Sequence, residues 1–113
     1  MAVICDKGDV AIVPFPFTDM ARAKTRPALA LSLKGPNEAS GQTIFAMITT
    51  ASHSRWPSDI PIANLASCGL SKPSVVRFKL FTLDNRLISR RIGSLSAADA
   101  RATQRMLKEL LGA

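Results

Sequence analysis

With 113 residues, the chain is long enough for one hydrophobic core and too short for two, so we expect a single domain over residues 1–113. Hydrophobic residues make up 47% of the chain and charged residues 20%, a balance that excludes wholesale disorder. The net charge of +7 favours an anionic partner, either nucleic acid or an acidic protein, although solubility alone also explains a basic surface.

The first half of the chain predicts three strands. Three of the residues 10–15 are β-branched, and prolines at 14 and 16 end the run, which predicts a strand at a sheet edge. A polar and basic loop over residues 18–25 then leads to a second strand at 27–33. Glycine, proline, asparagine and serine predict a turn over residues 34–41, before an apolar third strand at 43–50.

The second half begins with a loop over residues 52–58, a short strand at 59–62 and a loop over 64–72. In the next strand, at 73–80, apolar and basic residues alternate, which predicts one apolar and one mainly cationic face. The apolar face is expected to carry Val76, Phe78 and Leu80, and the cationic face Val75, Arg77 and Lys79.

The chain ends with a turn at Asp84, a last strand at 87–92 and a helix. Ser96 and Asp99 have the spacing of a capping box, apolar residues recur at helical spacing, and Gly112 is suited to end the helix. Several short strands with one terminal helix predict a mainly β fold, a compact antiparallel barrel.

The two cysteines, Cys5 and Cys68, have neither the spacing of a metal site nor a histidine nearby, and the sequence indicates no cofactor. The N-terminus has no charged and apolar leader, and no apolar run has the length of a membrane span. We therefore expect a cytoplasmic protein with free thiols and no membrane partner.

Candidate functional residues cluster where loops meet strands. Arg26 stands at the mouth of the second strand because Pro27 fixes the local backbone, although an exposed cation closing a loop is an equal alternative. Thr49 and Thr50 end the third strand on opposite faces, where β-propensity alone also explains either. Trp56, in the following loop, is suited to stack on a base or to cover the core.

Short motifs follow one another along the chain: Gly8-Asp9-Val10, Val13-Pro14-Phe15, Arg26-Pro27-Ala28, Ile48-Thr49, and Gly69-Leu70 through Pro73-Ser74-Val75-Val76-Arg77. Their order and spacing resemble those of the MazF/PemK family of toxins from bacterial type II toxin-antitoxin pairs. The resemblance implies an SH3-like barrel of the MazF/CcdB type, a homodimer and a cognate antitoxin protein. It also implies an endoribonuclease that cleaves single-stranded RNA without metal and with a sequence preference, an mRNA interferase.

By this resemblance the family's catalytic positions fall on Arg26, Thr49 and Arg77. We expect further RNA contacts from Lys24, Thr50, Ser52, Trp56 and Lys79. Some PemK-type members carry an aspartate where this chain has Lys79, and no histidine precedes Arg26. The general base is therefore left open among Asp19, Asp84 and His53.

Two alternatives compete with the nuclease. A catalytically silent RNA-binding or regulatory relative is consistent with Lys79 and with the missing loop histidine. A toxin that acts on gyrase, as CcdB does, would use the same barrel without cleaving RNA. Positive charge concentrated in residues 22–34 and 72–91 is compatible with a polyanion-binding face if the two segments meet.

Overall fold

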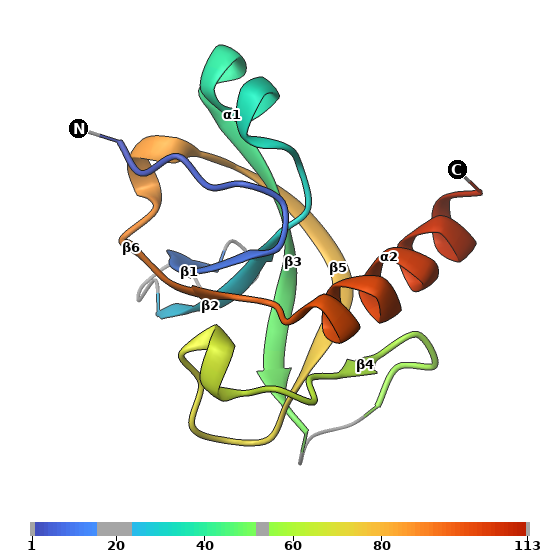
Figure 1. Ribbon diagram of the computed structural model, residues 1–113. Coiled ribbons are helices and arrows are strands. Elements are labelled where there is room, and N and C mark those ends of the chain that lie inside the picture. The colour runs from blue at the N-terminus through green and yellow to red at the C-terminus, as the bar shows by residue number, and fades with distance from the viewer. Residues whose placement is uncertain (1, 16–23, 52–54, 113) are drawn as a thin grey trace.

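A computed structural model describes residues 2–15, 24–51 and 55–112 (Figure 1). Within these ranges the elements are β1 Asp9–Pro14, β2 Thr25–Ala30, α1 Lys34–Ser40, β3 Gln42–Thr50, β4 Ile60–Pro61, β5 Ser74–Asp84, β6 Arg90–Ser94 and α2 Ala97–Leu111. Two short 3-10 helices, η1 Ala66–Cys68 and η2 Asn85–Leu87, flank β5. None of the described helices is long and apolar enough to cross a membrane.

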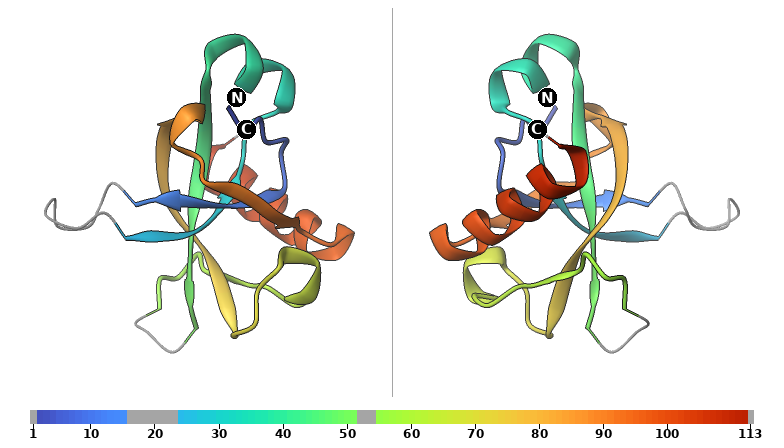
Figure 2. Two further views of the ribbon diagram at one scale, coloured as in Figure 1. Left: turned by 90° about the vertical axis from the view of Figure 1, so that its left-hand side faces the viewer. Right: turned by 90° about the vertical axis from the view of Figure 1, so that its right-hand side faces the viewer.

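The strands form one curled, antiparallel sheet in the order β4-β5-β3-β2-β1-β6. The hairpin of β1 and β2 crosses the β3 and β5 pair at a steep angle, as the side views show (Figure 2). This half-barrel with a C-terminal helix confirms the predicted mainly β fold. β1 lies between β2 and β6, so the prediction of an edge strand is wrong. Pro14 is tolerated because the ladder between β1 and β6 ends at Ile12, so no hydrogen bond to β6 requires an N–H group at residue 14.

Two glycines let the open side of the half-barrel come together. A Cβ atom at Gly93 in β6 would overlap the backbone of Ser67 and Cys68. Gly69, at φ +71°, has a backbone conformation that favours glycine, and a Cβ atom there would overlap the carbonyl of Ile92. The close approach places β6 against η1, which follows the opposite edge strand β4.

The core has two apolar clusters, one on each face of the sheet. Neighbouring residues in a strand alternate between the clusters, as the pleat requires: Phe45 belongs to the first and Ala46 to the second. The second cluster is covered by α2 through Met106 and Leu107. Both cysteines are buried and free, as expected, and burial raises the pKa of the Cys5 thiol to about 11.

Helix α2 begins and ends where the sequence predicts. The Ser96 hydroxyl accepts a hydrogen bond from the Asp99 amide at 3.2 Å, and Gly112 ends the helix at φ +69°. The Asp99 carboxylate accepts hydrogen bonds from the amides of Ala63 at 3.0 Å and Asn64 at 2.9 Å. It therefore ties α2 to the segment after β4.

The predicted turn over residues 34–41 is wrong, because these residues form α1. Pro36 lies in the first helical turn, where an amide hydrogen has no intrahelical partner to lose, and Gly41 ends the helix at φ +75°. Asn37 is buried and donates through Nδ2 to the carbonyls of Cys5 at 2.9 Å and Ser32 at 3.0 Å. These bonds explain why the segment folds back onto the barrel as a helix.

The alternation in β5 breaks at an irregularity of the β3–β5 ladder. Ala46 is opposite Leu80, whereas the next residue, Met47, is opposite Arg77. Leu80 is therefore 38% exposed, and Phe81 takes the inward position beyond the irregularity. The prediction that Leu80 belongs to the apolar face is wrong for this reason.

The last strand begins later than predicted, at Arg90 instead of residue 87. The Asp84 carboxylate accepts a hydrogen bond from the Arg86 amide at 2.9 Å, which starts η2 where the sequence pattern predicts strand.

Candidate functional site

The sheet register brings the three predicted catalytic residues to one face of adjacent strands. Ala28 in β2 is opposite Met47 in β3, and Met47 is opposite Arg77 in β5. Arg26 shares the face of Ala28, and Thr49 shares the face of Met47, because side chains alternate along a strand. The β2–β3 ladder ends at the Ala28–Met47 pair, before Arg26 and Thr49, and beyond it the β1–β2 hairpin diverges from β3. The shared face is nonetheless compatible with the predicted grouping of an arginine and a threonine.

Arg26 is an exposed side chain near the start of β2. Its guanidinium carbon lies 6.0 Å from the ring centroid of Phe15, at the outer limit of a cation–π contact. The Phe15 amide donates to the Lys24 carbonyl at 3.3 Å, which holds the two chain segments together at the point where Arg26 emerges. Lys24 itself is exposed beside it.

Arg77 has a different environment, because its side chain is only 10% exposed and pairs with Asp59. Nε donates to Oδ1 at 3.1 Å and Nη2 donates to Oδ2 at 2.8 Å, a bidentate arrangement. In the β4–β5 ladder Ile60 is opposite Val76, so one further step places Asp59 opposite Arg77. Arg77 lies on the face of β5 that is expected to be mainly cationic, but its charge is compensated there by a carboxylate.

Trp56 completes this arrangement. The guanidinium carbon of Arg77 lies 5.2 Å from the centroid of the Trp56 ring, and the Trp56 amide donates to Asp59 Oδ2 at 3.0 Å. Burial acts to raise the pKa of Asp59, but hydrogen bonds from Arg77 and Trp56 outweigh it and hold this pKa below the ordinary value. The hydrogen bond to Asp59 also raises the pKa of Arg77. Both groups are charged at neutral pH.

A cavity of about 530 Å³ lies beside this pair, within the volume range of small-ligand sites. Trp56, Thr50 and Arg77, three of the predicted site residues, meet in its lining. The full lining is Thr50, Ala51, Arg55, Trp56, Pro57, Asp59, Pro61, Val75 and Arg77. Apolar walls with a few polar groups are suited to hold a planar polar ligand.

The other predicted residues lie elsewhere. Arg26, Thr49 and Lys24 do not line the cavity, and Lys79 is half-buried at the β5 irregularity. Ser52, Asp19 and His53 lie outside the described residues.

Asp84 is placed far from the site, so this candidate for the general base is wrong. It is opposite Gln42 at one end of the β3–β5 ladder, whereas Thr49 is opposite Val75 near the other end. Its carboxylate pairs with Arg86, and that hydrogen bond lowers the pKa of Asp84 to about 2.

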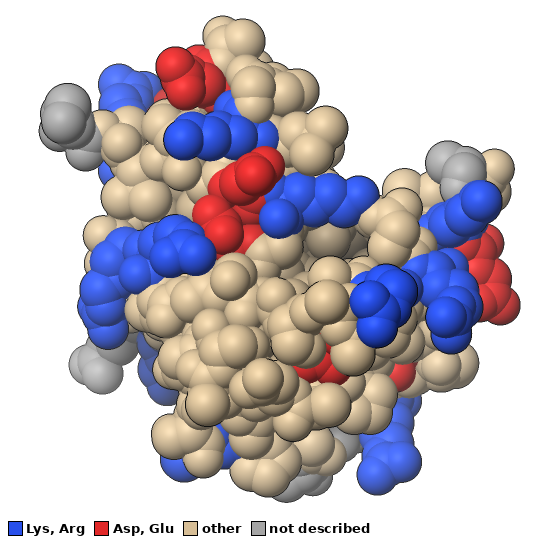
Figure 3. Space-filling model, in the orientation of Figure 1, with Lys and Arg blue, Asp and Glu red and all other residues tan. Residues whose placement is uncertain are grey.

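Positive charge is distributed over more of the surface than the two sequence segments suggest. In Figure 3, Lys and Arg side chains spread across the face that carries α2, with acidic side chains between them. Three of the arginines in residues 72–91 pair with aspartates: Arg77 with Asp59, Arg86 with Asp84 and Arg91 with Asp9. The segment 72–91 is therefore less cationic in effect than its composition indicates.

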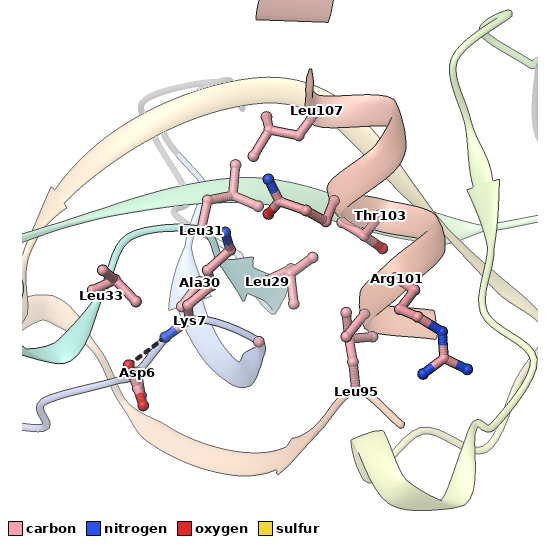
Figure 4. Close-up of a pocket in the computed structure, with 13 residues that line it drawn as sticks. Asp6, Lys7, Leu29, Ala30, Leu31, Leu33, Leu95, Arg101, Thr103 and Leu107 are labelled. Carbon is pink, nitrogen blue, oxygen red and sulfur yellow. Dashed lines mark hydrogen bonds between the residues drawn. The ribbon is translucent and has the colours of Figure 1, made fainter. Parts of the chain in front are cut away.

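A second cavity, of about 420 Å³, lies between α2 and the end of β2 (Figure 4). Leucines dominate its lining, among them Leu29, Leu31 and Leu107, and the buried Thr103 hydroxyl has no hydrogen-bond partner among the described residues. None of the predicted site residues lines it. The candidate site is accordingly the face that carries Arg26, Thr49 and Arg77.

Residues 6–111 match the sequence model of the PemK-like, MazF-like toxins of type II toxin-antitoxin systems. The chain belongs to this family. The match extends from the segment before β1 to the end of α2, so the MazF/PemK resemblance of the short motifs is confirmed.

Solved MazF structures share the fold of this MazF/PemK-family toxin. MazF from Deinococcus radiodurans has a TM-score of 0.76 at 22% identity, over 98% of this chain and 99% of that one. MazF-mt6 from Mycobacterium tuberculosis has a TM-score of 0.73 at 24% identity, over 92% and 96%. A mycobacterial endoribonuclease in complex with its cognate antitoxin has a TM-score of 0.75 at 16% identity, over 96% and 95%. No curated protein sequence matches the chain.

Asp59 is the site residue that the motifs of this MazF/PemK-family toxin did not indicate. One signal was present, because Asp59 is the only acidic residue between Glu38 and Asp84. Its partner was not apparent, since the pairing depends on how β4 aligns with β5 across a long connection.

Proposed function

We propose that this toxin is a metal-independent, sequence-preferring endoribonuclease that cleaves single-stranded RNA, an mRNA interferase. The observation that carries the proposal is the register that sets Arg26, Thr49 and Arg77 on one face of three adjacent strands. Two guanidinium groups and a hydroxyl on a rigid sheet are suited to bind one phosphodiester and its neighbour.

The reaction begins with attack of a ribose 2′-hydroxyl on the adjacent phosphorus, while the bond from phosphorus to the 5′-oxygen breaks. A base takes the proton of the 2′-hydroxyl, and an acid returns a proton to the leaving 5′-oxygen. The products are a 2′,3′-cyclic phosphate and a 5′-hydroxyl. The protein must stabilise the negative charge that gathers on the phosphate oxygens in between.

Arg26 and Thr49 are assigned to that charge stabilisation. The planar guanidinium of Arg26 grips two phosphate oxygens, and the Thr49 hydroxyl donates a further hydrogen bond. Arg77 acts as a second clamp beside the cavity. Arginine keeps its proton at ordinary pH, so these side chains are assigned electrostatic roles.

The bound RNA continues from this phosphate along the basic strand ends. Trp56 stacks on an unpaired base, and Thr50, Lys24, Ser52 and Lys79 contact the strand. Among the three candidates for the general base, Asp84 is excluded by its position, which leaves Asp19 and His53. Asp59 is a poor base because its lowered pKa makes its carboxylate a weak proton acceptor.

The proposal includes a cognate antitoxin and a cytoplasmic homodimer. Relatives of the same fold have been solved as MazE-MazF complexes and with a cognate antitoxin. An acidic, extended segment of such a partner would lie across the cationic face of this chain and compete with RNA.

The deciding experiment incubates the purified protein with single-stranded RNA in excess chelator. We expect fragments with 5′-hydroxyl ends, and a loss of about 10²–10³-fold in rate for Arg26→Ala. The matched control is Arg86→Ala, which removes an exposed arginine from η2, beyond the far end of β5, and is expected to leave the rate unchanged. Salt-sensitive RNA binding without product would favour the silent relative. Trapped DNA breaks in a gyrase assay, with intact RNA, would favour the gyrase-directed toxin.

A further inference from the structure

We propose that Asp59 is a positioning residue of the RNA site, which holds the Arg77 guanidinium in a fixed plane at the wall of the Trp56 cavity. The inference rests on the proposed endoribonuclease function. It adds a residue from the edge strand region, outside the motifs that carry the family resemblance.

The carboxylate fixes two partners at once. Its two oxygens accept hydrogen bonds from Nε and Nη2 of Arg77, at 3.1 and 2.8 Å, and one of them also accepts the Trp56 amide at 3.0 Å. The Asp59 amide in turn donates to the Trp56 carbonyl at 3.0 Å. Asp59 therefore sets the position of both the guanidinium and the indole that contacts it.

The side chains that Asp59 holds in place lie in the wall of the cavity. Arg77, Asp59 and Trp56 all line the same space of about 530 Å³, and Thr50 at the end of β3 lines it as well. A flexible arginine would lose side-chain entropy when it clamps a ligand, whereas one held by a bidentate carboxylate has already lost it. The Asp59–Arg77 pair thus holds the polar wall of the cavity in its binding geometry before RNA binds.

Stability alone is a weaker explanation of the pair. The free-energy cost of removing two charges from water offsets most of their electrostatic attraction. A buried ion pair therefore adds little to the stability of the fold compared with apolar side chains of equal volume. The side chains of Arg77 and Asp59 are only 10% and 7% exposed, yet they border a cavity that is large enough for a ligand. Charged groups kept in this position are typical of a binding site.

The test compares Asp59→Asn with Asp84→Asn in the full-length protein. Asp84 makes a bidentate pair of the same kind with Arg86, away from the cavity, so it is a matched control. We expect Asp59→Asn to lower kcat by about 10- to 100-fold with a smaller change in KM, since misplacing a binding group by about 1 Å has an effect of this size. Asp84→Asn is expected to leave both constants unchanged.

Two further measurements separate positioning from a purely structural role. In a double-mutant cycle that combines Asp59→Asn with Arg77→Gln, the double variant is expected to cleave RNA as slowly as Arg77→Gln alone, because Asp59 acts through Arg77. Asp59→Glu keeps the charge and is expected to recover part of the lost rate. In nuclear magnetic resonance spectra, the Arg77 Nε–H is expected to exchange with solvent more slowly than that of Arg86, and Asp59→Asn to remove the difference.

The outcomes distinguish the two proposals. If the wild type cleaves RNA, and a folded Asp59→Asn variant cleaves it as fast as Asp84→Asn does, only the role of Asp59 is overturned. Additive losses in the cycle with Arg77→Gln also overturn it. A wild type that neither cleaves nor binds single-stranded RNA overturns the endoribonuclease and the role of Asp59 together.

Discussion

Two aspartate–arginine pairs in this toxin have the same hydrogen-bond distances and different surroundings. Asp59 with Arg77 and Asp84 with Arg86 each combine a bond to Nε at 3.1 Å with one to Nη2 at 2.8 Å. The arginine side chain is 10% exposed in the first pair and 83% exposed in the second. Hydrogen-bond geometry alone therefore does not decide what an ion pair does. Burial, the aromatic neighbour and the adjoining cavity distinguish the first pair.

The largest difference between the pairs is expected in catalysis. Arg77→Met removes the arginine beside the cavity and is expected to slow RNA cleavage by about 10²–10³-fold, the usual effect of losing one preorganised donor. Arg86→Met removes an exposed arginine of equal size and is expected to stay within about twofold of the wild type. Initial rates on one fluorescent RNA measure both, and equal rates for the two variants would contradict the assignment.

The next difference is expected in stability. Asp59→Asn is expected to lower the free energy of unfolding by about 1.5–3 kcal/mol, because hydrogen bonds to charged groups contribute at this level and Arg77 is left buried without its full partner. Asp84→Asn is expected to change it little, since exposed pairs are screened by water. Urea unfolding curves of both variants test this, and a larger loss for Asp84→Asn would reverse the ranking.

The comparison also predicts a dependence on pH. The pKa of Asp59 is lower in the folded protein than the ordinary aspartate value of 3.8, so its stabilising contribution is fully present above that value. The contribution is lost as the pH falls through the lowered pKa of the folded state. The stability gap between wild type and Asp59→Asn is therefore expected to shrink only below about pH 4. A gap that already narrows between pH 7 and 5 would show that another group is responsible.

The smallest difference is expected in the response to salt. At about 1 M salt the screening length falls to about 3 Å, so any effect of Asp84→Asn on stability is expected to vanish. The effect of Asp59→Asn is expected to persist, because its pair is largely shielded from solvent. Unfolding curves at low and high salt make the measurement, and a parallel loss for both variants would show that the two pairs are equally exposed.

Much of the fold was predictable from local patterns. Alternation along β3 correctly assigned Phe45 and Met47 to one face, and the Ser96 and Gly112 signals correctly bounded α2. α1 was missed because its proline and glycine are also turn residues, and only the buried contacts of Asn37 show that the segment packs as a helix.

The site was predictable in part. A period of two is a local property, but the shared face of Arg26, Thr49 and Arg77 follows only from the pairing of their strands, which the structure supplies. The burial of Arg77 was not predictable, because it depends on the alignment of β4 with β5. Asp59 was missed for the same reason.

In the proposed mechanism, Arg26 and Thr49 bind one phosphate while the neighbouring nucleotide enters the cavity of Trp56 and Arg77. A crystal structure with single-stranded RNA that carries a 2′-O-methyl group at the cleaved nucleotide tests this directly. The mechanism predicts a phosphate within hydrogen-bond distance of Arg26 and Thr49, and a base against Trp56. RNA bound instead along the leucine-lined cavity beside α2, with Arg26 and Thr49 untouched, would contradict it.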